Sequence, residues 1–205
     1  MLNPYEGELV YGSSNGDVVD WLRRYHDWPM TNIMITGAEK SGKSTFAKVF
    51  HETTKGILLD AEESLPSISH MGDQVTIIDN AERVDEEWLF HLYNHQHRQR
   101  KPLILFTTLN PSEWVCRTAD FASRLKTFYV LMIHEPDDIM MRALLFKQLK
   151  GQGVEVGEGD LDYMVTHLDR SYSAVSDMCE RIVHETLRLK KPLSRSLIRD
   201  LLGDS

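Results

Sequence analysis

The chain has 205 residues, of which 41% are hydrophobic and 26% charged, a balance typical of one globular domain or of a domain with a small appendage. A net charge of −8 argues against a protein whose main task is to coat nucleic acid, and two cysteines, Cys116 and Cys179, argue against a disulfide framework or a zinc ribbon. No apolar run is long enough for a membrane span, and the first ten residues lack the basic start of a signal peptide, so we expect a cytoplasmic protein.

In chain order, the pattern first predicts a helix that starts after the polar residues 14–17 and ends near Trp28. Short apolar runs, which are typical of buried strands, then alternate with helical spacing around Phe46 and over residues 86–98. Strands that alternate with helices predict an α/β fold with a parallel sheet that is covered on both faces. The five predicted strands are 32–36, 57–60, 75–79, 103–107 and 128–133.

The pattern changes after Pro136, where no further strand is expected. We therefore predict a nucleotide-binding α/β domain over residues 1–134 and a small helical domain over 135–205. The four amphipathic helices predicted for the second domain are 138–150, 160–167, 174–189 and 194–202.

The strongest functional signal is the segment 37–45, which fits the phosphate-loop pattern G-x-x-x-x-G-K-[ST] between a predicted strand and a predicted helix. Glycines let the backbone approach phosphate closely, and the loop amides and the helix N-terminus attract an anion. Lys43 is expected to reach the β- and γ-phosphates and Ser44 to hold Mg²⁺; the alternative is a glycine turn with a solvated lysine. The candidate nucleotide-binding residues are Gly37, Ala38, Glu39, Lys40, Ser41, Gly42, Lys43, Ser44 and Thr45.

Asp79 closes the third predicted strand, where a carboxylate of P-loop proteins meets the Mg²⁺ shell, so it is a candidate metal-binding and catalytic residue. Asn80 follows, at the place where many P-loop ATPases have a second carboxylate that polarises the attacking water. An amide cannot accept that proton, so weak intrinsic ATP hydrolysis is expected, with Glu82 as a substitute base that we do not favour.

A second set of polar residues follows the fourth predicted strand. Thr107, Thr108 and Asn110 lie where side chains can touch the γ-phosphate or the attacking water. A strand end that turns through Asn110 and Pro111 explains the same residues equally well.

Five segments together resemble DnaA-type AAA+ ATPases, specifically the short DnaA paralogues of the Hda family in their alphaproteobacterial form. The resemblance covers nearly the whole chain and implies a P-loop AAA+ fold, in which a five-stranded parallel sheet is sandwiched by helices and followed by a small all-helical lid. It also implies that ADP or ATP binds with Mg²⁺, and that Val10, Tyr11 and Arg170 contribute to that site. The segments that carry it are 10–15, 37–45, 78–82, 120–125 and 168–172.

The same resemblance implies that Arg124 is an arginine finger, a residue that completes a partner's ATP site and raises hydrolysis there by ~10³–10⁵ in other systems. In the Hda family the finger is thought to act on ATP bound to the initiator DnaA, on a loaded sliding clamp, which blocks re-initiation of replication. Implied partners are therefore a DnaA-type initiator, the sliding clamp and a second copy of the chain in a homodimer. Without the family, Arg124 would be read as half of a surface ion pair.

Several residues depart from the family pattern. Ser173 occupies the lid position of the usual sensor arginine, and Arg170, one helical turn earlier, is the candidate replacement. Met1 to Val10 lacks the glutamine of the family's clamp-binding segment, so clamp binding through these residues is doubtful. The short connection between the second and third predicted strands has no room for a DNA-binding insertion, and no helix-turn-helix follows, so direct sequence-specific DNA binding is not expected.

Three other functions stay open at this point. A small-molecule P-loop kinase fits the length, although its phosphate loop would be expected nearer the first residue and its lid richer in arginine. A helicase-loader-like ATPase and a nucleotide-binding scaffold without catalysis also fit the phosphate loop.

Overall fold

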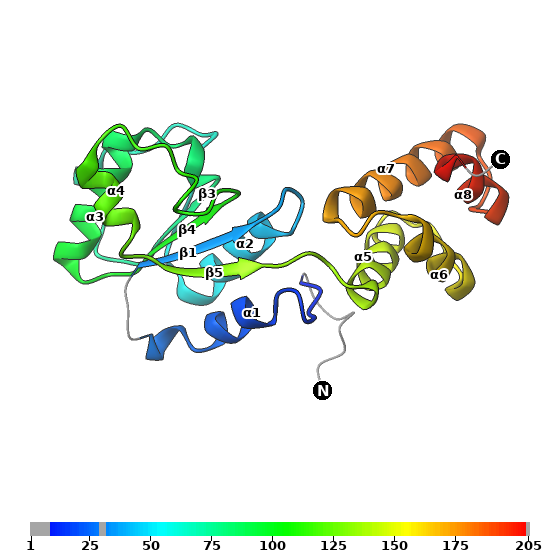
Figure 1. Ribbon diagram of the computed structural model, residues 1–205, viewed down its shortest axis with the longest axis horizontal. Helices are drawn as coiled ribbons and strands as arrows, with labels where there is room; N and C mark the ends of the chain where they lie inside the picture. Colours follow the sequence, from blue (N-terminus) through cyan, green and yellow to red (C-terminus); the bar gives the residue numbers. More distant parts are fainter. Residues whose placement is uncertain (1–8, 29–31, 204–205) are drawn as a thin grey trace. The chain divides into compact units, whose positions relative to one another are not determined.

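The computed structural model describes residues 9–28 and 32–203 and divides the chain into two units (Figure 1). The sheet unit comprises residues 17–38 and 42–133, and the helical unit comprises the residues up to Gly16, residues 39–41 and those from His134 onward. Each unit has its own core, so each is described by itself.

The sheet unit is built on five parallel strands in the order β2-β3-β4-β1-β5, which confirms the predicted fold class. Both faces of the sheet are covered, and the strands are accordingly near-continuous apolar runs. β1 lies inside the sheet between β4 and β5, so the segment after β1 emerges beside the end of β4. The strands are β1 (Asn32–Gly37), β2 (Ile57–Asp60), β3 (Thr76–Asp79), β4 (Leu103–Thr107) and β5 (Tyr129–Ile133).

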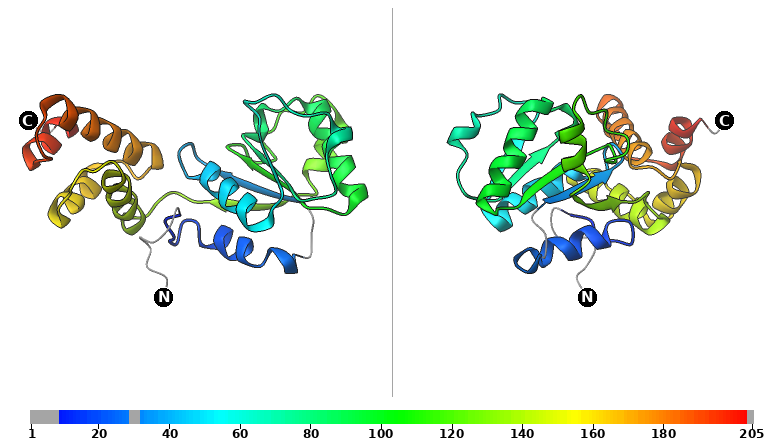
Figure 2. Two further views of the ribbon diagram at one scale, coloured as in Figure 1. Left: turned by 180° about the vertical axis from the view of Figure 1, so that it is seen from behind. Right: turned by 60° about the vertical axis from the view of Figure 1, so that its left-hand side comes forward.

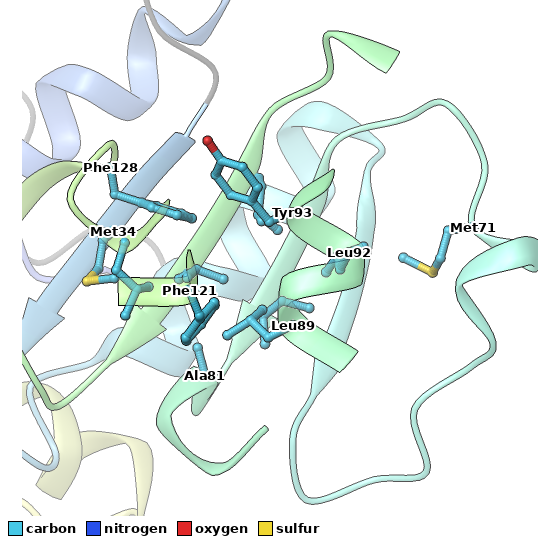
Figure 3. Close-up of a cluster of buried hydrophobic side chains, with 12 residues drawn as sticks. Met34, Met71, Ala81, Leu89, Leu92, Tyr93, Phe121 and Phe128 are labelled. Atoms are coloured by element: carbon cyan, nitrogen blue, oxygen red, sulfur yellow. The ribbon is translucent and has the colours of Figure 1, made fainter. Parts of the chain in front are cut away.

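Helices cover both faces of the sheet (Figure 2), and side chains alternate between the two faces along each strand. On one face, α2 packs along β1 to β4, and Phe50 of α2 stacks on Trp28 with ring centroids 5.4 Å apart. On the other face, Met34 and Leu105 join a cluster of side chains from α3 and α4 (Figure 3). The helices are α1 (Gly16–Arg23), α2 (Lys43–Thr54), α3 (Glu86–Gln99) and α4 (Ala119–Leu125), with single 3-10 turns at Tyr25–Asp27, Ile68–His70 and Ala81–Arg83.

The turn before α1 uses the polar residues that suggested a helix cap. The Asn15 side chain accepts a hydrogen bond from the Gly12 amide at 3.0 Å and donates one to the Val10 carbonyl at 2.8 Å. The amide of His134 donates to the carbonyl of Ser14 at 2.8 Å. Asn15 therefore holds the turn that precedes the helix, and the hydrogen bond between Ser14 and His134 joins this segment to the rest of the helical unit.

The helical unit packs four helices around a core that includes Met141, Leu145, Met164 and Ile182. Side chains at the helix starts accept backbone hydrogen bonds, as N-caps do: Asp137 for α5, Ser171 for α7 and Ser194 for α8. Across the described parts of the chain, we find no helix with the length and hydropathy needed to cross a membrane. The four helices are α5 (Asp138–Gly151), α6 (Glu158–His167), α7 (Tyr172–Leu189) and α8 (Arg195–Leu202).

Candidate functional site

Three strand ends that carry candidate site residues lie at one edge of the sheet, which we call the carboxyl edge. Because the strands are parallel and in register, Gly37 of β1, Asp79 of β3 and Thr107 of β4 all close their strands on this side. Open α/β sheets bind ligands outside the carboxyl ends of their strands. The predicted phosphate loop and the candidate metal residue Asp79 therefore lie at the same edge.

The phosphate loop leads from β1 directly into α2. Gly42 precedes the helix with a φ of +89°, in the left-handed region that favours glycine. No side chain caps the first turn of α2, so its amide groups are not taken up by a capping residue. A helix start of this kind suits a bound anion.

Lys43 lies inside the loop. Its side chain is buried, and its ammonium group donates hydrogen bonds to the carbonyl oxygens of Gly37 at 2.9 Å and Ala38 at 2.8 Å. The Ser41 hydroxyl is buried and has no hydrogen-bond partner among the described residues, whereas Ser44 is exposed at the start of α2. A buried ammonium, an unsatisfied hydroxyl and an exposed hydroxyl on one loop fit a polyphosphate with its metal ion.

The other loop residues differ in their ion pairs and in their exposure. Lys40 has a φ of +60°, and its ammonium group lies 2.7 Å from Asp177 and 3.3 Å from Glu180, both on α7. The hydrogen bond to Asp177 is the main reason why the pKa of Lys40 lies above its ordinary value. Glu39 is exposed and Thr45 is partly buried.

Asp79 and Asn80 are held by neighbours at the carboxyl edge. Asp79 is buried, and its Oδ1 accepts the amide of Asn80 at 3.1 Å. Asn80 adopts a φ of +53°, and its side chain donates to Oδ1 of Asp60 at 3.2 Å. Asp60 is the residue of β2 that pairs with Asp79. Asn80 thus connects two strand-end carboxylates.

Glu82, the candidate substitute base, is bound by the next strand. Its Oε1 accepts the Thr108 amide at 3.2 Å and the Thr108 hydroxyl at 2.7 Å, while its Oε2 is buried without a partner in the described structure. Burial opposes the charge of this carboxyl, but hydrogen bonds from Thr108, from its own amide and from Thr107 outweigh burial and hold its pKa below the ordinary value.

The remaining candidates after β4 also contact residues of the same edge. The Thr107 side chain is fully buried, and its hydroxyl accepts the amide of Leu109 at 3.0 Å. The Asn110 oxygen lies 3.4 Å from the Thr36 hydroxyl, and its amide nitrogen donates to Glu113 at 3.1 Å. The polar groups at the carboxyl edge therefore form hydrogen bonds mainly with one another.

Arg124 lies elsewhere in the sheet unit, in the last turn of α4, and is exposed. Its guanidinium carbon is 5.5 Å from the centre of the Tyr93 ring, and it forms no ion pair with any residue in 9–28 or 32–203. β5 begins a few residues later at Tyr129, which pairs with Ile33 of β1, whereas the phosphate loop follows Gly37. Ile33 and Gly37 are separated by about 13 Å along β1. α4 therefore ends toward the edge of the sheet opposite the phosphate loop.

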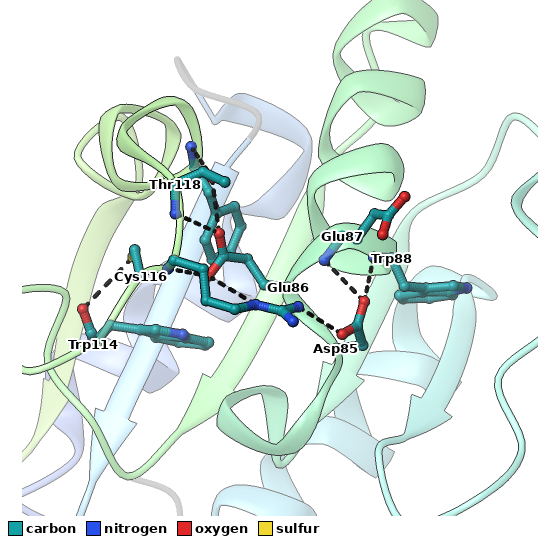
Figure 4. Close-up of polar contacts among 9 residues, drawn as sticks. Asp85, Glu86, Glu87, Trp88, Trp114, Cys116 and Thr118 are labelled. Carbon is teal, nitrogen blue, oxygen red and sulfur yellow. Dashed lines mark hydrogen bonds and ion pairs between the residues drawn. The ribbon is translucent and has the colours of Figure 1, made fainter.

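The N-terminus of α4 is held by a carboxylate of α3 (Figure 4). Glu86 accepts the amide of Arg117 at 2.6 Å, and the amide and the hydroxyl of Thr118 at 2.9 and 2.8 Å. Asp85 accepts from the Arg117 guanidinium at 2.7 Å, and Thr118 caps α4. Burial opposes the charge of Glu86, but these hydrogen bonds dominate and lower its pKa.

Three other predicted site residues belong to the helical unit. Val10 is buried, Tyr11 is 40% exposed, and Arg170 is paired with Asp138, with nitrogen and oxygen 2.9 Å apart. Ser173 lies in the first turn of α7 and is partly buried. Most of Met1 to Val10, the segment that lacks the family's clamp-binding glutamine, lies outside the described residues.

Sequence reasoning missed Thr36, Asp60, Glu113 and Tyr93 as contributors to these arrangements. Thr36 and Asp60 each end an apolar run, which is the signal that identified Asp79. Glu113 and Tyr93 carry no such signal, because their roles depend on packing between elements.

Comparison with known proteins shows that this fold is similar to those of DnaA and RuvB structures. Domain III of the replication initiation protein DnaA from Thermotoga maritima superposes with a TM-score of 0.76, covering 96% of this chain and 94% of that one at 14% identity. AMPPCP-bound DnaA from Aquifex aeolicus gives 0.67 over 93% of this chain and 67% of that chain at 16% identity. The RuvB Holliday junction branch migration motor of Thermotoga maritima gives 0.67 over 94% and 69% at 13% identity.

Sequence similarity alone is weak. No family model matches the chain. The chromosomal replication initiator protein DnaA of Lactobacillus delbrueckii subsp. bulgaricus is 22% identical over 132 residues, which are 64% of this chain and only 29% of that initiator. The superpositions show that the chain has a DnaA-like AAA+ fold.

Proposed function

We propose that this chain binds adenine nucleotide at its phosphate loop and promotes hydrolysis of ATP on a DnaA-type initiator through Arg124, as an Hda-type regulator of replication initiation. One observation carries the proposal. Arg124 is an exposed cation without an ion-pair partner among the described residues, and it lies toward the sheet edge opposite the chain's own phosphate loop. Such a residue is available to a nucleotide on another chain.

Nucleotide binding is supported by the loop geometry. Lys43 binds the β- and γ-phosphates, and the uncapped start of α2 binds phosphate oxygens through its amides. Ser44 and Asp79 hold Mg²⁺, which supplies positive charge beside the phosphates. AMPPCP-bound DnaA shares this fold, which supports adenine as the base.

The chain's own hydrolytic activity is proposed to be weak. Asn80 cannot accept a proton, and its amide is bound to Asp60. Glu82 is hydrogen-bonded to Thr108 and has a lowered pKa, which makes it a poor base for water. The bound nucleotide therefore serves mainly to set the state of the regulator, and either ADP or ATP fits this role.

Arg124 acts on the partner's nucleotide by electrostatics. A guanidinium presents a planar, permanently charged set of donors that matches phosphate oxygens, and it stabilises the charge that develops during phosphoryl transfer. The −8 net charge of the chain makes origin DNA an unfavourable ligand, so contact with a DnaA-type initiator is the proposed route to the replication origin. A sliding clamp and a homodimer are further proposed partners in the cytoplasm.

The test is single-turnover hydrolysis of ATP preloaded on the cognate initiator, with this chain and clamp-loaded DNA added. Arg124→Ala is expected to abolish the stimulation, a loss of about 10³-fold or more. Arg117→Ala removes another exposed arginine of the same region and is expected to keep it. A reaction without the clamp separates clamp-dependent from direct action.

Other results would indicate other functions. Stimulation that survives Arg124→Ala would reject the finger, and no stimulation by the wild-type chain would reject the regulator. Turnover with a small-molecule acceptor would then indicate a P-loop kinase, and a helicase partner would indicate a loader. Nucleotide binding without either activity would leave a scaffold.

A further inference from the structure

We infer that Tyr93 positions Arg124, with its ring as the surface that holds the guanidinium and its hydroxyl as the link to the Arg124 backbone. The inference rests on the proposed function, because positioning matters to function only if Arg124 acts on a partner. It names a positioning residue on α3 that no motif in the sequence indicated.

The first contact is between the Arg124 side chain and the ring. The guanidinium carbon lies 5.5 Å from the ring centre of Tyr93, inside the ~6 Å over which a cation is attracted to an aromatic face. Tyr93 is only 3% exposed, while Arg124 is exposed. The arginine thus lies at the surface with its charge over a ring that belongs to the core.

The second contact is between the ring hydroxyl and the chain after α4. The Tyr93 hydroxyl is 3.1 Å from the Thr127 hydroxyl, and Thr127 donates from its hydroxyl at 2.7 Å and from its amide at 2.9 Å to the carbonyl of Arg124. Since the Thr127 hydroxyl has one proton and gives it to Arg124, the Tyr93 hydroxyl is the donor to Thr127. Tyr93 therefore restrains both the side chain and the backbone of Arg124.

The ring itself is fixed by its neighbours. Phe128 packs against it with ring centres 5.9 Å apart, and His97 stacks nearly parallel to it, also at 5.9 Å. Figure 3 shows Tyr93 beside Phe128 in the cluster beneath α3 and α4. A ring held on several sides provides a constant position for the cation.

An aromatic ring can hold the guanidinium of Arg124 and still leave it able to bind a phosphate. A carboxylate partner would neutralise the guanidinium and compete with phosphate oxygens for its donors, whereas an aromatic face attracts the charge and leaves the donors free. A long arginine side chain also loses rotamer freedom when it binds, and prior restraint lowers that cost.

The functional test compares two ring variants with a matched control. Tyr93→Leu is expected to lower the maximal rate of stimulated hydrolysis by about tenfold and leave the half-saturating concentration within about twofold, because the charge is misplaced and the docking surface is kept. Tyr93→Phe keeps the ring and is expected to retain most of the rate. Phe50→Leu truncates a buried ring on the opposite face of the sheet, where it stacks on Trp28, so it reports the effect of lost packing alone.

A second measurement needs no partner and no nucleotide. Proton NMR of the wild-type chain is expected to show the Arg124 δ-methylene protons shifted upfield by the Tyr93 ring, with the assignment made from Arg124→Lys. The shift should vanish in Tyr93→Leu and persist in Tyr93→Phe.

The outcomes separate the two proposals. An unshifted Arg124 in the wild type, or equal rate losses in Phe50→Leu and Tyr93→Leu, would overturn the positioning role. A ring-shifted Arg124 in a chain that does not stimulate any initiator would support the geometry and reject the proposed function.

Discussion

The carboxyl edge of the sheet and the end of α4 differ in whether their polar side chains bond to other side chains. At the carboxyl edge, Asn80 bonds to Asp60 and Glu82 bonds to Thr108, so the groups nearest the phosphate loop are engaged with one another. At the end of α4, the exposed side chain of Arg124 has no ion-pair partner among the described residues, and its guanidinium carbon lies 5.5 Å from the centre of the Tyr93 ring.

This contrast shows how one fold could keep the proposed nucleotide-binding residues apart from the residue proposed to act on another chain. Binding needs the loop, Lys43 and Asp79, all of which are present at the carboxyl edge. Rapid hydrolysis there would also need a free base, and the residues in the appropriate places are an amide and a hydrogen-bonded carboxylate. On the other side of the sheet unit, Arg124 is exposed and has no ion-pair partner among the described residues, which is why the proposed catalytic role falls to it.

The largest expected effect comes from removing the cation of the loop. Lys43→Ala should weaken the binding of ADP and ATP by about 100-fold or more, because charge-assisted hydrogen bonds to phosphate are lost. Calorimetric titration measures it, and Lys48→Ala, an exposed lysine on the same helix, should bind as the wild type does. If Lys43→Ala bound ADP and ATP as tightly as the wild type, the phosphate loop would not be the nucleotide-binding site. The contrast between the carboxyl edge and the end of α4 would then lose its basis.

Much of the sheet unit could be predicted from sequence, for identifiable physical reasons. Each strand is an apolar run that leads into a polar or glycine residue, as in the run that ends at Asp79, and α3 repeats apolar residues at helical spacing. α4 could not be predicted in this way, because its seven residues bury only Phe121 and Leu125. Its start depends on Glu86 of another helix, and no local pattern records that contact.

The second largest effect concerns the N-terminus of α4, the helix that carries Arg124. Glu86→Ala should lower the free energy of unfolding by about 2 kcal/mol, because three donors of Arg117 and Thr118 lose their acceptor. Urea unfolding measures the change. The neighbouring Glu87→Ala, whose side chain is 81% exposed, should change stability by less than about 0.5 kcal/mol. A similar small effect at Glu86 would mean that α4 is held by packing alone.

The candidate site was harder to predict than the fold, because its contacts depend on strand order. Asp60 and Asn80 belong to neighbouring segments of the sheet only because β2 pairs with β3, and Thr36 meets Asn110 only because β1 lies beside β4. Motifs identified Lys43 and Asp79, whose roles depend on local geometry. They could not show that the remaining polar residues would bond to one another.

An intermediate effect would come from giving the carboxyl edge the base that it lacks. Asn80→Glu should raise intrinsic ATP hydrolysis by about tenfold, since a carboxylate can accept the proton of the attacking water. Steady-state phosphate release measures the rate, and Asn80→Gln, which has the same length without the charge, should stay at the wild-type rate. An unchanged rate in Asn80→Glu would show that the weak hydrolysis has a cause other than the missing carboxylate.

The smallest effect tests whether Glu82 is a structural group of that edge. Its pKa is lower in the folded chain than in the unfolded one, so the unfolded state binds more protons between the two values and stability rises with pH there. The stabilisation is complete above the ordinary glutamate pKa of about 4.3 and is lost as the pH falls through the lower folded value. Thermal unfolding should therefore show Glu82→Gln less stable than wild type by about 1 kcal/mol or less near pH 7, with the difference shrinking below about pH 4. Glu63→Gln removes an exposed carboxylate outside this network and should show no such pH-dependent difference. If Glu82→Gln behaved like Glu63→Gln, the hydrogen bonds to Glu82 would not stabilise the fold. Glu82 would then be available as a base, and the carboxyl edge would no longer differ from the end of α4 by having its polar groups bound to one another.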